Sequence, residues 1–309
     1  MHPAYSIIVF TTLTGIGYGL AASLGLGLLD PSSLAARAGY GLALLLIAAG
    51  LVSSLGHLGH PERAWRALSE WRSSWLSREG VAAVAAFLPI GAAALAAIAF
   101  GRTIPALGLV VALASAVTVF CTAMIYASLK TVAQWHTPLT PLAYLAFAAA
   151  GGLVAASAVA ALTGEGSRLP IGLAVAALAV AWLVKALWWR RAAHSRSAAT
   201  PESATGIAGL GPVRLLERPH VTENYLTKEM GYRIARKHSV RLRQLAVLFG
   251  ALLPLAALSV GAVAPRSSPA TVLPPLALGS HLLGMLVERW LFFAEARHTV
   301  MLYYGAETA

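Results

Sequence analysis

The sequence has few charged residues for its length. Only 11% of its 309 residues are Asp, Glu, Lys or Arg, and 58% are hydrophobic, whereas soluble domains carry about 25% charged residues. A chain this apolar cannot hide its hydrophobic surface in a core of ordinary size. The composition therefore excludes a soluble globular protein and predicts an integral membrane protein.

Cysteine is almost absent as well. The single cysteine, Cys121, rules out a disulfide within the chain and a Cys-x-x-Cys motif. Iron–sulfur clusters are held by several Cys thiolates, so we expect no cluster bound by this chain alone. Cys121 lies in an apolar run and is interpreted as a buried structural thiol. We also expect no cleavable signal peptide, because no basic segment precedes the first apolar run.

Eight apolar runs are long enough to cross a bilayer, which takes about 20 helical residues. They lie at 4–29, 34–57, 79–100, 104–128, 138–162, 170–189, 241–264 and 272–302. The sequence therefore predicts an all-α fold, a polytopic bundle of eight transmembrane helices that forms a single membrane domain over 1–309.

Basic residues are divided unevenly between the two faces of this predicted bundle. One face receives both termini, the segments 58–78 and 190–243, and most of the basic residues outside the spans, while the other has only Arg37, Arg102, Arg168 and Arg266. Lys and Arg concentrate in cytoplasmic loops, so we expect the first face to be cytoplasmic. A face that docks an acidic protein would show the same distribution. We attribute the net charge of +11 to topology and expect no nucleic-acid partner.

The segment 58–78 joins the second and third spans and is rich in tryptophan and arginine. Pro61 suits a first helical turn, and apolar residues then recur at helical spacing at Ala64, Leu68, Trp71 and Trp75. This pattern predicts an amphipathic helix that lies in the membrane interface with tryptophans at headgroup depth.

Anchoring does not account for His57, His60 and Glu79. His57 lies where the second span leaves the hydrocarbon and Glu79 opens the third span, so both are expected to border one interfacial pocket. Ionisable groups at this depth are costly and are candidates for function, and a His with a carboxylate can exchange protons with the oxygens of a quinone. In the alternative interpretation, Glu79 only complements the positive end of its helix, and His57 only binds a carbonyl at a helix end.

The final span contains a second cluster of ionisable residues. His281, Glu288 and Glu295 are spaced by seven residues, which places them on one stripe, and Arg289 adjoins it. Two interpretations stay open: an interhelical ion pair that holds the bundle together, and a proton path toward the interfacial pocket. Lys185 is predicted to extend its ammonium group to the interface. A haem needs two facing axial histidines, and only His281 is clearly deep, so we expect no haem.

The long connection 190–243 contains a loose linker at 192–211 followed by a basic segment. Thr222 is expected to cap a helix that continues into the seventh span. The segment either rests on lipid headgroups or docks a partner protein. In the docking interpretation, the residues concerned are Arg63, Arg66, Arg233, Arg236 and Lys237.

Four stretches of the chain resemble the membrane-anchor subunit of dimethyl sulfoxide reductase and its relatives, within the wider polysulfide-reductase-type anchors. They are HPAYSIIVFTTLTGIGYGL, HLGHPERAW, SWLSREG and ERWLFFAEARHTVM, and the resemblance covers essentially the whole chain. It implies a subunit of the bacterial inner membrane without haem or metal, which is not catalytic alone. It also implies a site where menaquinone or ubiquinone exchanges electrons with a four-cluster iron–sulfur subunit, which serves a molybdopterin catalytic subunit. The family's quinone-site histidine and glutamate fall on His57 and Glu79.

One part of the chain departs from the reductase anchor. That anchor has a short connection between its sixth and seventh spans, whereas here the connection is long and contains ERPHVTENYLTKEMGYRIARKH. This form is similar to the anchor of cytoplasm-facing sulfite dehydrogenase, which implies that electrons from sulfite pass into quinone. The alternative that the chain anchors a dimethyl sulfoxide reductase, or another sulfur-compound reductase, and oxidises menaquinol stays open. A transporter and a purely structural anchor are the alternatives from other classes, although the paired broken helices of a transporter are not seen.

Overall fold

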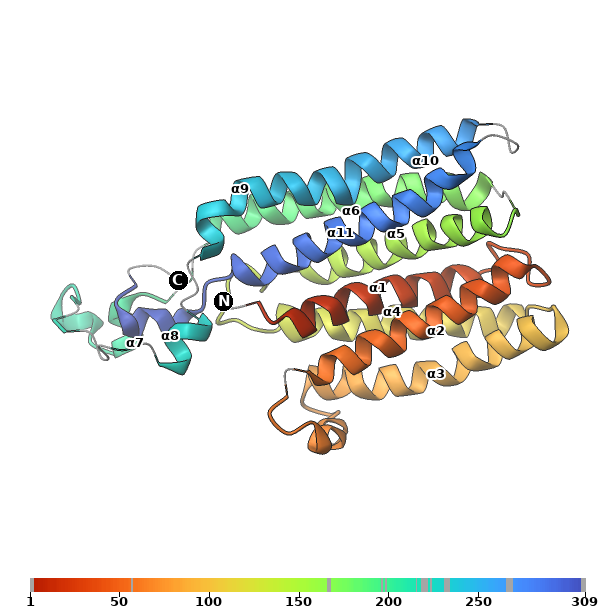
Figure 1. Cartoon of the computed structure of the whole chain (residues 1–309). Coiled ribbons are helices and arrows are strands. Elements are labelled where there is room, and N and C mark those ends of the chain that lie inside the picture. The colour runs from red at the N-terminus through yellow and green to blue at the C-terminus, as the bar shows by residue number, and fades with distance from the viewer. Residues whose placement is uncertain are drawn as a thin grey trace.

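A computed structural model of the chain shows long helices lying side by side in one bundle (Figure 1). It describes residues 3–56, 58–165, 168–195, 197, 199–214, 216–217, 222, 224–230, 234–264 and 269–306. Within these ranges, all regular secondary structure is helical, and eight helices are long and apolar enough to cross a membrane. The predicted polytopic bundle of eight transmembrane helices is confirmed.

The first six spans are single α-helices: α1 (Tyr5–Gly25), α2 (Leu34–Leu55), α3 (Trp75–Phe100), α4 (Pro105–Ala127), α5 (Leu139–Leu162) and α6 (Arg168–His194). The seventh joins α9 (Ile234–Val247), a π-helical turn (Leu248–Leu252) and α10 (Leu253–Val263), and the eighth joins a 3₁₀ turn (Pro269–Val272) to α11 (Leu273–Ala294). Short helices lie outside the spans: a 3₁₀-helix (Pro61–Leu68), α7 (Pro201–Thr205), a 3₁₀ turn (Ala208–Leu210), α8 (Tyr225–Met230) and a C-terminal 3₁₀-helix (Thr299–Tyr304).

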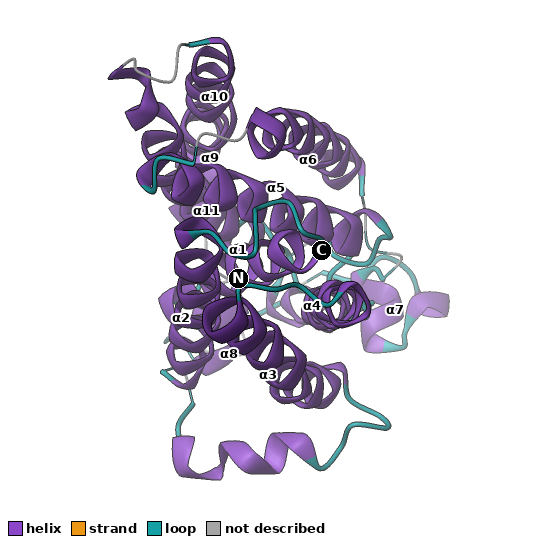
Figure 2. Ribbon diagram, turned by 90° about the vertical axis from the view of Figure 1, so that its right-hand side faces the viewer, coloured by secondary structure: helices purple, strands orange, loops and turns teal. Residues whose placement is uncertain are grey.

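Helix α1 lies at the centre of the bundle and packs against α2, α4, α5 and α11 (Figure 2). Its contact with α5 is close because glycines meet there. A β-carbon added to Gly19 would lie 1.8 Å from the carbonyl oxygen of Ala148. Small residues let helix backbones approach in membranes, where the hydrophobic effect does not drive helices together. This contact brings the polar side chains of α1 next to those of α5.

The segment between α2 and α3 differs from the predicted amphipathic helix. It is a 3₁₀-helix only over Pro61–Leu68, and Trp75 is already the first residue of α3, so the predicted apolar stripe is divided between two elements. The helix is interrupted by a turn before α3. The Arg78 guanidinium holds this turn by donating to the carbonyls of Trp71 (3.0 Å) and Arg72 (2.6 Å). The segment still extends from the bundle beyond the ends of α2 and α3 (Figure 1).

The eighth span ends earlier than predicted, at Ala294 rather than at 302. The carbonyl of Phe292 accepts a hydrogen bond from the indole N–H of Trp135 (3.0 Å) instead of continuing the helix. The N–H of Thr299 then donates to the Thr131 carbonyl (3.0 Å), so the chain after α11 is held against the loop between α4 and α5.

The connection between the sixth and seventh spans also differs in detail. Helix α6 continues to His194, past the predicted end of its span. The cap of α8 is Asn224 and not Thr222, because Asn224 Oδ1 accepts from the N–H of Thr227 (2.8 Å) and Thr227 Oγ1 accepts from the N–H of Asn224 (2.9 Å). Helix α8 is described over Tyr225–Met230 and α9 from Ile234 onward, and residues 231–233 lie outside the described part of the chain, so continuation of this helix into the seventh span stays a prediction.

Candidate functional site

Glu79 lies one turn inside α3 and faces α4. The sequence predicts that the third span opens at Glu79, but α3 begins at Trp75, where the Ser74 side chain caps the helix by accepting from the Ser77 N–H. The carboxylate is therefore buried, with 6% of the residue exposed, and accepts a hydrogen bond from the Thr122 hydroxyl of α4. Glu79 is a carboxyl group held between two spans and not a group at a free helix end.

The two histidines predicted beside Glu79 lie in the segment between α2 and α3. His57 lies outside the described residues. The Nδ1 atom of His60 lies 3.0 Å from Glu62 Oε1, and both side chains are more than half exposed. The structure therefore brings Glu79 together with Thr122, and it places His60 in an exposed pair with Glu62.

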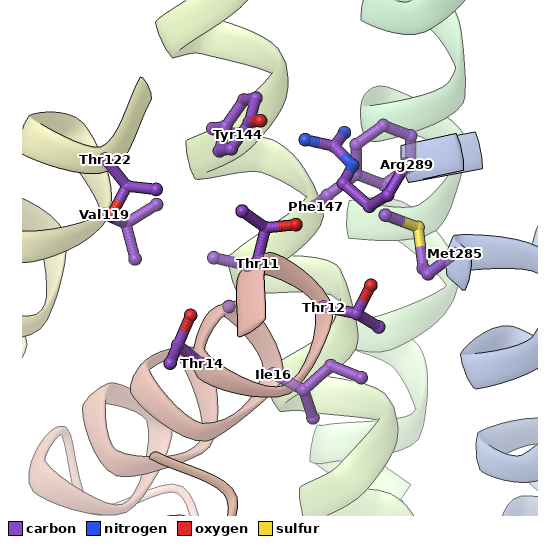
Figure 3. Close-up of a pocket in the computed structure, with 12 residues that line it drawn as sticks. Thr11, Thr12, Thr14, Ile16, Val119, Thr122, Tyr144, Phe147, Met285 and Arg289 are labelled. Carbon is purple, nitrogen blue, oxygen red and sulfur yellow. The ribbon is translucent and has the colours of Figure 1, made fainter. Parts of the chain in front are cut away.

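A small pocket opens beside Thr122 in the interior of the bundle (Figure 3). Its volume is about 20 Å³, which is enough for one water molecule. Helices α1, α4, α5 and α11 all contribute to its lining, and its polar side chains include Thr11, Thr12, Thr122, Tyr144 and Arg289. Figure 3 shows the Thr11 hydroxyl and the Arg289 guanidinium turned toward the space between these helices.

Arg289 belongs to a buried cluster of three charges with Lys185 and Glu288. Lys185 Nζ lies 2.5 Å from Glu288 Oε1, and Arg289 pairs with the other carboxylate oxygen. The three side chains are between 0% and 3% exposed. The prediction that Lys185 reaches the interface is wrong, because Glu288 supplies a counter-charge inside the bundle. The Lys185 ammonium also lies 3.9 Å from the ring centroid of Trp188.

The three members of the predicted stripe on the last span each contact another span. His281 is fully buried, with Nδ1 3.0 Å from the Gly250 carbonyl. Glu288 pairs with the lysine of α6, and Glu295 pairs with Arg243 of α9, where Nε lies 2.9 Å from Oε1. These contacts are the ones expected if the stripe holds the last span against its neighbours. Proton conduction along the stripe stays a prediction.

The π-helical turn was not anticipated from the sequence. Pro254 has no N–H, so it cannot donate to the carbonyl of Gly250 four residues earlier. That carbonyl instead accepts from Trp182 Nε1 (2.9 Å) and faces His281. The Ser280 hydroxyl donates to the neighbouring Phe249 carbonyl (2.7 Å). The one sign of this irregularity in the sequence is the proline inside the predicted seventh span, because proline disturbs the hydrogen bonding of a helix.

The residues predicted to dock a partner are described only in part. Arg63 and Arg66 are exposed on the 3₁₀-helix, where the Arg66 guanidinium lies 5.6 Å from the Trp65 ring centroid. Arg233 lies outside the described residues, and the side chains of Arg236 and Lys237 are likewise not described. The docking interpretation of these five residues stays a prediction.

Sequence reasoning also missed Thr122, Thr12 and Tyr144. Isolated hydroxyls in apolar spans carry no pattern that points to a site. One signal was present on α4, since Thr118 and Thr122 are four residues apart and therefore share a helix face.

Comparisons with known proteins identify relatives along nearly the whole chain. The family model described as DMSO reductase anchor subunit (DmsC) matches residues 1–193. The chain is also 34% identical to the sulfite dehydrogenase C subunit of Allochromatium vinosum over 331 aligned positions, which cover 98% of this chain and 99% of that protein. This second similarity continues beyond residue 193, through the long connection and the last two spans. The chain therefore belongs to the DMSO reductase anchor subunit family.

Proposed function

We propose that this membrane anchor subunit exchanges electrons between membrane quinone and a partner four-cluster iron–sulfur subunit, which serves a molybdopterin catalytic subunit. The observation that carries the proposal is the buried Glu79 carboxylate with its Thr122 partner. A buried acid on a membrane span is a candidate for proton exchange, and quinone chemistry couples each electron pair to protons. Family membership supports a partner complex.

Glu79 fits the acid–base role because of its surroundings. Thr122 orients the carboxylate across the gap between α3 and α4, so that a proton can be held or released at a fixed position. The pocket that Thr122 lines has a volume of about 20 Å³, which has room for water and is too small for a quinone ring. We therefore place the ring at the ends of α2 and α3, where His57 would bind one quinone oxygen and His60 would exchange protons with water.

Sulfite is the proposed electron source for the catalytic partner. The support is the similarity over almost the whole length to a protein named as a sulfite dehydrogenase subunit. In this direction, electrons from sulfite reduce membrane menaquinone or ubiquinone. The second candidate is an anchor that oxidises menaquinol for a dimethyl sulfoxide or other sulfur-compound reductase, and the description of the matching family model favours it.

Both termini lie at one end of the bundle, together with α7 and α8 (Figure 1). The C-terminal 3₁₀-helix ties this end together, because the Tyr303 hydroxyl donates to the Ala204 carbonyl (2.7 Å) and Asn224 Nδ2 donates to the Tyr304 hydroxyl (3.1 Å). We propose that this end is the cytoplasmic face in the bacterial inner membrane, and that the partner subunit docks there. The excess of basic residues in its loops supports the orientation.

The proposal is tested on the purified complex by comparing two rates. One rate passes electrons between the catalytic subunit and a soluble dye, and the other passes them through quinone. Glu79→Gln should lower the quinone-linked rate by about 10²–10⁴-fold, the usual effect of removing an acid–base group, and leave the dye-linked rate unchanged. Equal quinone-linked rates in the variant and the unaltered complex would contradict the proposal.

A further inference from the structure

Another pocket lies at the end of the bundle that carries both termini, between α6 and the loop that joins α4 to α5. Its volume is about 460 Å³, within the range of about 300–1,000 Å³ for sites that take small molecules. Both elements supply cationic or protonatable side chains, Lys130 and His136 from the loop and Arg191 and His194 from the last turn of α6. None of the described residues that line this pocket is acidic. Its charge therefore favours an anion.

The Arg191 guanidinium is held in place by the loop. Its Nη1 and Nη2 atoms donate to the carbonyls of Ala133 (3.4 Å) and His136 (3.3 Å). A guanidinium has five N–H donors, so these two bonds leave donors for an anion. They also hold the end of α6 beside the loop, which brings Lys130 and Arg191 to one pocket. A charged group that is already ordered loses less freedom when it binds a ligand.

The two histidines of the pocket can add further donors. His136 Nδ1 lies 2.7 Å from the Ala127 carbonyl, and His194 Nδ1 lies 2.8 Å from the Arg190 carbonyl. Because a carbonyl can only accept, Nδ1 carries a hydrogen in both rings. A ring that is also protonated at Nε2 has that second N–H left to donate to an anion.

The pocket adjoins the lipid-facing side of α6. Leu187 and Leu183 precede Arg191 by four and eight residues, so the three side chains share one face of the helix. The two leucines are 43% and 62% exposed, and an exposed apolar face of a spanning helix contacts lipid chains. Arg191 therefore lies one helical turn beyond this apolar face, at the depth expected for phospholipid phosphates. A ligand from the bilayer can reach the pocket directly.

Each of these cations has a simpler explanation when it is considered alone. Basic residues stabilise the C-terminal end of a helix and mark the cytoplasmic side of a membrane protein. Neither effect requires the loop and α6 to place their cations around one pocket. Basic pockets between transmembrane helices bind the headgroups of anionic lipids. We propose that this pocket binds the phosphate headgroup of an anionic phospholipid, whose chains lie along the exposed face of α6. This site is independent of quinone exchange.

Arg191 and Arg190 provide a matched pair of variants. They are neighbours at the end of α6 and both are exposed, but of the two only Arg191 lines the pocket. Arg191→Gln removes a charge from the site, whereas Arg190→Gln removes the same charge at the same depth outside it. Lys130→Gln changes an exposed residue of the loop and keeps the test possible if Arg191→Gln does not fold.

The experiment titrates the full-length protein in detergent with dioleoylphosphatidylglycerol or dioleoylphosphatidylcholine and counts bound lipids by native mass spectrometry. The two lipids have the same chains, and only the first has a net negative headgroup. We expect the unaltered protein and Arg190→Gln to bind one phosphatidylglycerol about 10-fold or more tightly than phosphatidylcholine. Lys130→Gln and Arg191→Gln should each weaken phosphatidylglycerol binding about fivefold, and together about 30-fold, at about 1 kcal/mol per cation. Equal weakening by Arg190→Gln and Arg191→Gln would overturn the proposal in favour of a general surface charge.

Two further measurements separate a lipid from other anionic ligands. Glycerol 3-phosphate has the phosphate without the chains, and at the same concentration it should not displace phosphatidylglycerol. Displacement would assign the pocket to a soluble anion and overturn the proposal. The double variant Lys130→Gln with Arg191→Gln should keep the soluble subunits of the complex bound. If it releases them and keeps its preference for phosphatidylglycerol, the pocket is a partner contact and the proposal is wrong.

Discussion

The Thr122 hydroxyl on α4 donates a hydrogen bond to the Glu79 carboxylate on α3, and both residues are buried. Thr122→Val keeps the shape of the side chain and removes the bond. A hydrogen bond to a charged group contributes about 1.5–3 kcal/mol, so we expect a lower melting temperature in detergent and a lower quinone-linked rate.

Thr118→Val is the control for this prediction. Thr118 lies one turn away on α4, and its hydroxyl donates to the backbone carbonyl of Ala114 at 2.9 Å. Its replacement should leave the quinone-linked rate unchanged. If both variants lower that rate equally, the bond between Thr122 and Glu79 has no special role.

The buried cluster of Lys185, Glu288 and Arg289 should respond very unequally to the loss of its members. Glu288→Gln leaves two cations buried without a counter-charge, and breaking a buried pair in this way costs about 3–5 kcal/mol. Lys185→Met leaves Glu288 paired with Arg289 and should cost much less. Thermal unfolding of the two variants in the same detergent measures the difference, and equal melting temperatures would show that the charges are not coupled as described.

The proposed orientation of the bundle, with both termini in the cytoplasm, is supported by the uneven distribution of basic residues and can be tested directly. Fusions of a reporter enzyme that is active only outside the cytoplasm should be active after Arg102, in the turn between α3 and α4, and inactive after Thr200. A reporter active only in the cytoplasm should give the reverse results. Activity of the first reporter after Thr200 would place both termini outside.

Partner docking predicts a charge effect confined to one face. The quadruple change of Arg63, Arg233, Arg236 and Lys237 to Glu should release the soluble subunits from membranes, because it reverses the charge offered to the partner. Arg37→Glu and Arg102→Glu, on the opposite face, should retain them. Sedimentation of washed membranes with an immunoblot for the iron–sulfur subunit measures retention, and full retention by the quadruple variant would assign these charges to topology alone.

The fold was predictable from the sequence because apolar runs of about 20 residues separated by short polar turns have one dominant physical cause, which is the thickness of the bilayer. The bounds of spans were less predictable where a side chain from elsewhere competes for a backbone group. Trp135, which takes the carbonyl of Phe292 and ends α11 early, illustrates this. The π-helical turn arises in the same way from Pro254 and the side chains that bind the freed carbonyl.

The candidate site was predictable only where a charge is unusual for its surroundings. Glu79 and Glu288 stand out as acids in apolar runs, but their partners do not. Thr122 is an ordinary residue in a span until α3 and α4 pack together. The sequence predicts Lys185 at the interface because a lone lysine near a helix end reaches water, and only the packing of the spans reveals its contact with Glu288.

The central claim is that Glu79 and His57 connect this anchor to membrane quinone. Its most direct test measures quinone-linked and dye-linked rates on the same preparations of the complex carrying Glu79→Gln, His57→Ala, or the control Glu70→Gln, which alters an exposed acid before α3. The account predicts that the first two variants lose the quinone-linked rate by about 10²–10⁴-fold and keep the dye-linked rate, while the control keeps both. Unaltered quinone-linked rates in Glu79→Gln and His57→Ala would contradict it.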